Sequence, residues 1–77
     1  MMSLEEARRR PHIEVRCGFG DSMAVRRAAI EHASSRFQEA YGYGPVGLLS
    51  AYDIDRNERI FVVFSLDEER SQMEERQ

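Results

Sequence analysis

The sequence predicts a small α+β domain of the order β-α-β-β. One main helix is expected on one face of a three-stranded sheet, with short frayed helices at the ends. Three observations predict this fold. Residues 12–17 alternate between apolar and polar side chains, and residues 23–41 show a helical pattern. Residues 46–54 and 60–66 are two apolar runs joined by a polar turn.

The N-terminal part predicts a short helix followed by a half-buried strand. Ser3 and Glu6 form a capping-box pattern. Pro11 ends this helix, because the residue before a proline is pushed out of helical geometry. In the strand at 12–17, the apolar side chains share one face, and these are Ile13, Val15 and Cys17.

The main helix is expected from about Met23 to Tyr41, with Asp21 or Ser22 as its cap. Ile30 and Phe37 are the large apolar side chains of one helical side, and the rest of that side is mostly alanine. Small residues let the helix lie close to a sheet. The glycine that follows suits the left-handed position at which many helices end.

The two apolar runs predict a hairpin. In the second strand, Leu49 and Ala51 share one face, and the other carries Val46, Leu48, Tyr52 and Ile54. The helix returns the chain, so the first two strands run the same way and the third runs opposite to both. Because a central strand is covered on both faces and the third strand is the most apolar, we expect the order 1-3-2.

The third strand has apolar side chains on both faces, and a single helix covers only one face of a small sheet. If the helix takes the even-numbered face, the uncovered side chains are Phe61 and Val63, with Leu49 beside them. Such a patch is unusual on a monomer. We therefore expect a homodimer or higher self-assembly, or docking on a protein partner. The charged tail folding back over this face is the alternative.

Three further residues complete the predicted interaction surface. Arg26 lies inside the apolar stripe of the helix, where its stem can lie over the sheet edge with the charge in water. Alternatively, its charge is aimed at a partner, for example at Glu14 of a neighbouring chain. Tyr41 and Tyr43 form an aromatic corner among glycines, a composition found both at binding sites and at ordinary helix ends.

Length and composition predict one domain over 1–77, with a core at 12–66 and charged ends at 1–10 and 67–77. A net charge of −3 argues against a nucleic-acid binder, whose affinity depends on phosphate neutralisation. A single cysteine and the absence of a signal-like or membrane-spanning apolar run lead us to expect a cytoplasmic protein that does not contact a membrane.

No set of residues predicts catalysis, a metal site or a cofactor. The run from Asp53 to Asn57 resembles the start of a calcium loop. However, Glu58 stands where that loop needs glycine, and Phe64 where it needs a bidentate glutamate. A polar hairpin turn is therefore the better interpretation.

Neither the cysteine nor the histidines predict a reactive or metal-binding site. Cys17 has the parity of the strand's apolar face, so we expect it to be buried and inert. His12 and His32 lie at no recognisable metal-ligand spacing. We expect no enzyme activity, since no acid, base or nucleophile converges with another.

The β-α-β-β order, the helix sequence 24–34 and the terminal residues 63–68 resemble those of dodecins, over about residues 12–68. This resemblance implies an oligomeric shell that binds a small ligand, a flavin. The flavin-stacking tryptophan of that family has no counterpart here, because the chain contains no tryptophan. The favoured function is therefore a small non-enzymatic interaction module, and a dodecin-like ligand binder is the alternative.

Overall fold

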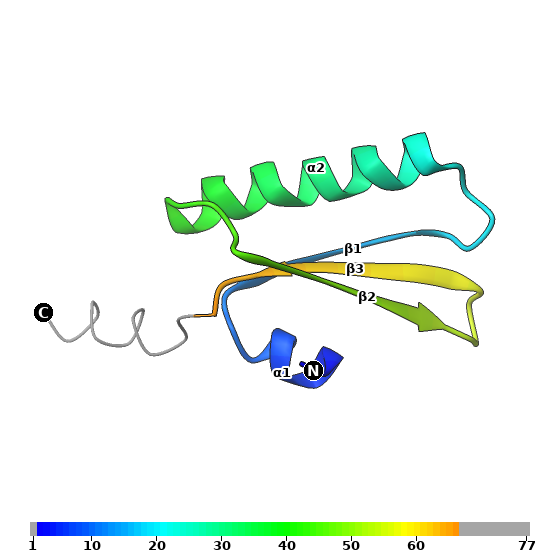
Figure 1. Ribbon diagram of the computed structural model, residues 1–77, viewed down its shortest axis with the longest axis horizontal. Helices are drawn as coiled ribbons and strands as arrows, with labels where there is room; N and C mark the ends of the chain where they lie inside the picture. The colour runs from blue at the N-terminus through cyan, green and yellow to red at the C-terminus, as the bar shows by residue number, and fades with distance from the viewer. Residues whose placement is uncertain (1, 67–77) are drawn as a thin grey trace, which may run out of the picture.

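The computed structural model describes residues 2–66, and its elements follow the predicted order (Figure 1). They are the short helix α1 (Leu4–Arg8), strand β1 (His12–Gly18), the long helix α2 (Met23–Tyr41), and the hairpin strands β2 (Gly47–Asp53) and β3 (Glu58–Phe64). All pairing is antiparallel, in the order β1-β3-β2. The predicted α+β class, strand order and main helix are confirmed. The prediction of a helix or lid at 67–77 lies outside the described residues.

The predicted helix ends are confirmed by hydrogen bonds. In the capping box of α1, the hydroxyl of Ser3 accepts from the Glu6 amide, and the Ser3 amide donates to the Glu6 carboxylate, each at 3.1 Å. At α2, the Ser22 hydroxyl accepts from the Val25 amide at 3.3 Å. Gly42 ends this helix with a φ of 83°, a conformation that glycine adopts without a steric penalty.

Strand β3 begins and ends two residues earlier than its apolar run suggested. Glu58 and Arg59 belong to the strand, because they pair with residues of both β1 and β2. An apolar run cannot mark the polar start of a strand. The hairpin turn is closed by Asn57, which has a φ of 52° and accepts a 2.7 Å hydrogen bond from the Tyr52 hydroxyl. Asparagine tolerates this left-handed conformation better than most residues.

The sheet lies between the two helices, with α2 on one face and α1 on the other (Figure 1). On the α2 face, Val63 packs in one cluster with Ala33 and Phe37. On the α1 face, Val62 packs in a second cluster with Ala7, Ile60 and Phe64. Strand β3 is therefore buried on both faces, as its sequence required.

One sequence expectation is wrong, namely that Phe61 and Val63 would be the uncovered side chains. Helix α2 packs on the odd-numbered face of β3, and Phe61 and Val63 are 6 % and 2 % exposed. The register explains this choice. Ile13 and Val15 of β1 stand opposite Val63 and Phe61, so the apolar face of β1 and the odd-numbered face of β3 form one surface that α2 covers.

Candidate functional site

The α2 face of the sheet is only partly covered, because α2 packs mainly on β1 and β3. A helix is about 10 Å wide and strands are about 4.8 Å apart, so one helix covers about two strands. Strand β2 is left out. We give the name β2 strip to a row of four large apolar side chains, two of β2 that point to this face and two from the residues that flank the strand. It consists of Val46, Leu48, Tyr52 and Ile54, with exposed fractions of 65 %, 51 %, 47 % and 77 %.

The opposite face of β2 is also incompletely covered. Helix α1 has five residues and buries Ala7 against β3. A groove of about 460 Å³ remains between this N-terminal segment and β2. Among residues 2–66, no charged side chain lines this groove, which is formed by Met2, Leu4, Leu48, Leu49, Ser50, Ala51 and Phe64. The margin of the sheet at β2 is thus apolar on both sides.

The two edge strands of the sheet differ in charge. On its α1 face, β1 carries Glu14 and Arg16, and Glu14 receives a 2.8 Å hydrogen bond from Arg8. Strand β2 has no charged residue before Asp53 at its end. Charges on an edge strand discourage pairing with other chains, and an uncharged edge invites it. By this criterion β2 is the open edge.

The charges of β1 belong to a network that joins all three strands. Arg16 contacts Asp53 at 2.8 Å and Glu58 at 3.3 Å, and Arg8 of α1 binds Glu14. The hydrogen bond from Arg8 is the main cause that lowers the pKa of Glu14, and the one from Arg16 does the same for the pKa of Asp53. Glu14 is thus engaged within its own chain, on the face opposite α2.

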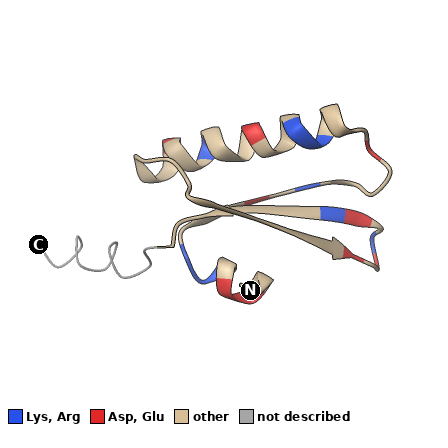
Figure 2. Ribbon diagram, viewed as in Figure 1, with Lys and Arg blue, Asp and Glu red and all other residues tan. Residues whose placement is uncertain are grey.

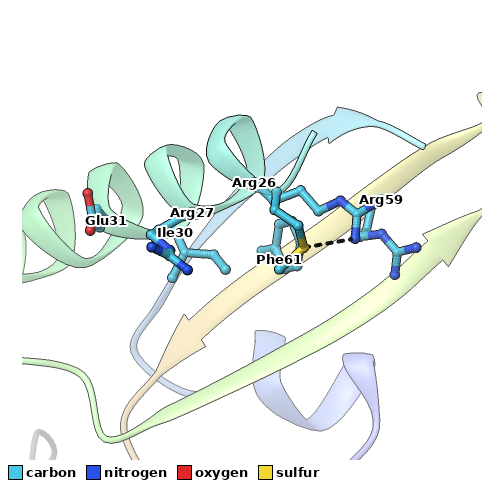
Figure 3. Close-up of a pocket in the computed structure, with 7 residues that line it drawn as sticks. Arg26, Arg27, Ile30, Glu31, Arg59 and Phe61 are labelled. Atoms are coloured by element: carbon cyan, nitrogen blue, oxygen red, sulfur yellow. Dashed lines mark hydrogen bonds between the residues drawn. The ribbon is translucent and has the colours of Figure 1, made fainter. Parts of the chain in front are cut away.

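A pocket of about 270 Å³ lies between α2 and β3 and contains Arg26, one of the predicted interaction residues (Figure 3). Arg26 is half-buried, and its Nε donates to the carbonyl of Asp21 at 3.1 Å. Since Glu14 lies on the other face and binds Arg8, the alternative pairing of Arg26 with a neighbour's Glu14 would have to displace an existing contact.

The other predicted surface residues are not gathered into one patch. Leu49 is half-buried on the α1 face, because it pairs with Val62, and so it does not lie beside Val63. Tyr43 packs against the α2 cluster, with its ring 5.6 Å from that of Phe37. Tyr41 is 40 % exposed and also stacks on Phe37.

The β2 strip was missed as a surface, although its signal was present. The alternation of Val46, Leu48, Tyr52 and Ile54 places them on one face, but it does not say whether that face is covered. One helix covers about two strands, so it leaves one strand of a three-stranded sheet uncovered. This comparison would have identified the strip. The spare apolar face was predicted on β3, but the exposed apolar side chains lie along β2.

The described part of the chain offers few groups that could form a metal or catalytic site. Residues 2–66 contain no cluster of three or more histidine, cysteine, aspartate or glutamate side chains that could hold a metal ion. The carboxylate of Asp53 accepts from the amides of Asp55 and Arg56, as in a polar turn. Cys17 is buried, as predicted. None of the described helices has the length and apolarity needed to cross a membrane.

Comparison with known proteins adds no relative. No protein-family model, no curated protein and no solved structure matches the chain. The similarity to dodecins therefore remains one of element order and short segments. A functional proposal has to be built on the geometry of β2.

Proposed function

We propose that this protein is a non-enzymatic interaction module that self-associates through the open edge of β2. The observation that carries the proposal is the β2 strip, an apolar row along an edge strand that has no charged residue before Asp53. Antiparallel pairing of two β2 strands would extend the sheet from three strands to six, with a two-fold axis at its centre. Such isologous pairing is the commonest symmetry of homo-oligomers.

The strip is complementary to itself in the register that pairs the full length of β2. With Gly47 opposite Asp53 of the second copy, Leu48 stands opposite Tyr52, Val46 opposite Ile54, and Ser50 opposite its own equivalent. Every large side chain of the strip then meets an apolar neighbour, and no two like charges meet within β2. Each such pair contributes about 0.2–1 kcal/mol, in addition to the backbone hydrogen bonds.

The central position of Ser50 provides a sharp test. Ser50 is exposed in the single chain, so Ser50→Glu should leave the fold intact. In the dimer it would place two carboxylates opposite each other, as Ser50→Lys would place two ammonium groups. We expect each variant to raise the dimer dissociation constant at least tenfold, and an equimolar mixture of the two to restore association as a heterodimer. Ser35→Glu, at an exposed position of α2, is the control for added charge.

The measurement is sedimentation velocity across a concentration series. Wild-type protein should move from the 9.0 kDa chain towards twice that mass. A monomer up to about 1 mM, where an association of about −4 kcal/mol would be visible, contradicts the proposal. So does a dimer whose mass is unchanged in both Ser50 variants. A shell of many copies would favour the dodecin-like alternative instead.

A further inference from the structure

The pocket between α2 and β3 is lined by more positive than negative side chains, unlike the chain as a whole. Its lining contains three arginines, Arg26, Arg27 and Arg59, and one carboxylate, Glu31. The protein as a whole carries a net charge of −3, so the local sign is reversed. Figure 2 shows the arginines of the first turns of α2 and the one near the start of β3 on facing elements.

The three arginines have no carboxylate partner within residues 2–66. Within residues 2–66, the ion pairs are made by Arg8 and Arg16, both on the α1 face. The Nε of Arg59 is buried and has no hydrogen-bond acceptor there. A buried donor without an acceptor destabilises a protein unless something supplies the acceptor. Arg59 therefore has an unsatisfied donor, whereas Nε of Arg26 is already bound to the Asp21 carbonyl and only its terminal N–H groups remain for an anion.

The side chain of Arg59 is held in place by an aromatic contact rather than by an ion pair. Its guanidinium lies 5.0 Å from the centre of the Phe19 ring, in a cation–π contact. Phe19 is held in turn by Tyr52, with ring centres 4.9 Å apart. A guanidinium held this way is oriented before a ligand arrives, so less side-chain freedom is lost on binding.

The rest of the pocket is apolar. Met23 and Ile30 of α2 and Phe61 of β3 complete the lining, and Figure 3 shows Arg26 at the end of the pocket near Arg59, with Glu31 at the other end. A volume of about 270 Å³ is slightly below the range of pockets that hold drug-sized ligands, about 300–1,000 Å³. It suits a metabolite-sized molecule.

We propose that this pocket binds a small organic anion, a phosphate or carboxylate group attached to an apolar body. Arg59 and Arg26 bind the anionic group, Arg27 adds its charge at the rim, and the apolar body lies on Ile30 and Phe61. The inference is independent of self-association, because all seven lining residues belong to α2 and β3 of one chain.

The test is calorimetric titration of the full chain with four probes. Phenyl phosphate and phenylacetate carry both an anionic group and an apolar ring, and the tighter of the two identifies the anionic group. Inorganic phosphate has only the charge, and benzyl alcohol has only the ring. We expect the better aromatic anion to bind at least tenfold more tightly than either of these. Equal binding of the aromatic anions and benzyl alcohol, or of phenyl phosphate and inorganic phosphate, overturns the proposal.

Variants locate the binding. Arg59→Gln should weaken the binding of the better aromatic anion at least tenfold, and Glu31→Gln should strengthen it about twofold or more, because the one carboxylate is removed. Arg36→Gln makes the same charge change on α2 outside the pocket and should stay within about twofold of wild type. An equal loss in Arg36→Gln and Arg59→Gln overturns the site. In the NMR spectrum, the Nε–H signal of Arg59 should shift on binding in wild type and also in Ser50→Glu.

Discussion

Two neighbouring valines test whether the short helix α1 is a real cover for the sheet. Val62 is fully buried on the α1 face, and Val63 is 2 % exposed on the α2 face. If both faces are core, Val62→Ala and Val63→Ala should destabilise the protein by similar amounts. If α1 covers its face poorly, the change at Val62 should cost much less than the change at Val63.

The expected magnitude follows from the burial. Each substitution removes two buried methyl groups, worth about 0.8 kcal/mol each, and leaves a small cavity, so we expect a loss of about 2 kcal/mol in the free energy of unfolding. A chain of 77 residues has a total of about 4–12 kcal/mol. Urea denaturation followed by circular dichroism, with a slope of about 1 kcal/mol per molar, should show midpoint shifts of about 2 M.

Val25 supplies the matched control, because it is the same residue type and is 48 % exposed on α2. Val25→Ala should stay within about 0.5 kcal/mol of wild type, since alanine has the higher helix propensity. All proteins are compared at one concentration, because self-association would add to stability. A loss below about 0.5 kcal/mol in Val62→Ala, next to about 2 kcal/mol in Val63→Ala, would refute the two-sided core.

Two further predictions concern packing and acid. Gly47→Ala should cost about 1–3 kcal/mol in urea denaturation, because an added methyl group would overlap the Phe64 ring, whereas Gly44→Ala, with open space around the added carbon, should cost less than 1 kcal/mol; equal losses would argue against the close contact. The folded-state pKa values of Glu14 and Asp53 are lowered, so their contribution to stability is complete above the unfolded-state values and is lost as pH falls through the folded-state ones. The free energy of unfolding should therefore fall from about pH 4.5 downwards, less steeply in Glu14→Gln, and identical slopes in that variant and wild type would contradict the role of the Arg8 contact.

The order of the elements was predictable because each carries a local signal. Ser3 with Glu6, Ser22 and Gly42 mark helix ends through hydrogen bonds or backbone geometry that involve only neighbouring residues. The alternation of 12–17 and the apolar run at 60–66 mark strands in the same local way. The order 1-3-2 followed from chain direction and from the rule that the most apolar strand is central, and the structure confirms it.

The choice of face was not predictable from β3 alone, because both of its faces are apolar. It depends on register, where a shift of one residue exchanges the faces. The register of β1 against β3 places Ile13 opposite Val63, and this pairing joins the two apolar faces under α2. The sequence already contained the one-sided pattern of β1. Aligning that pattern with β3 would have assigned Phe61 and Val63 to the core.

The pocket was beyond prediction for a different reason. Arg26 was singled out from its helical angle, but Arg59 is more than thirty residues away and is brought to it only by the packing of α2 on β3. Nothing local distinguishes Arg59 from the other arginines of the chain. Its buried Nε and its stacking on Phe19 are properties of the folded surroundings.

The strip and the pocket are separate surfaces that meet at one side chain. The ring of Phe19 contacts Tyr52 of the β2 strip on one side and Arg59 of the pocket on the other. Pairing of β2 would bury Tyr52 next to a second copy, while an anion in the pocket would engage Arg59. Because both contacts act on the same ring, Phe19 is the place where association and ligand binding can influence each other. The variants at Ser50, Glu31 and Arg36 leave the contacts of this ring with Tyr52 and Arg59 in place, so they test the two proposals separately.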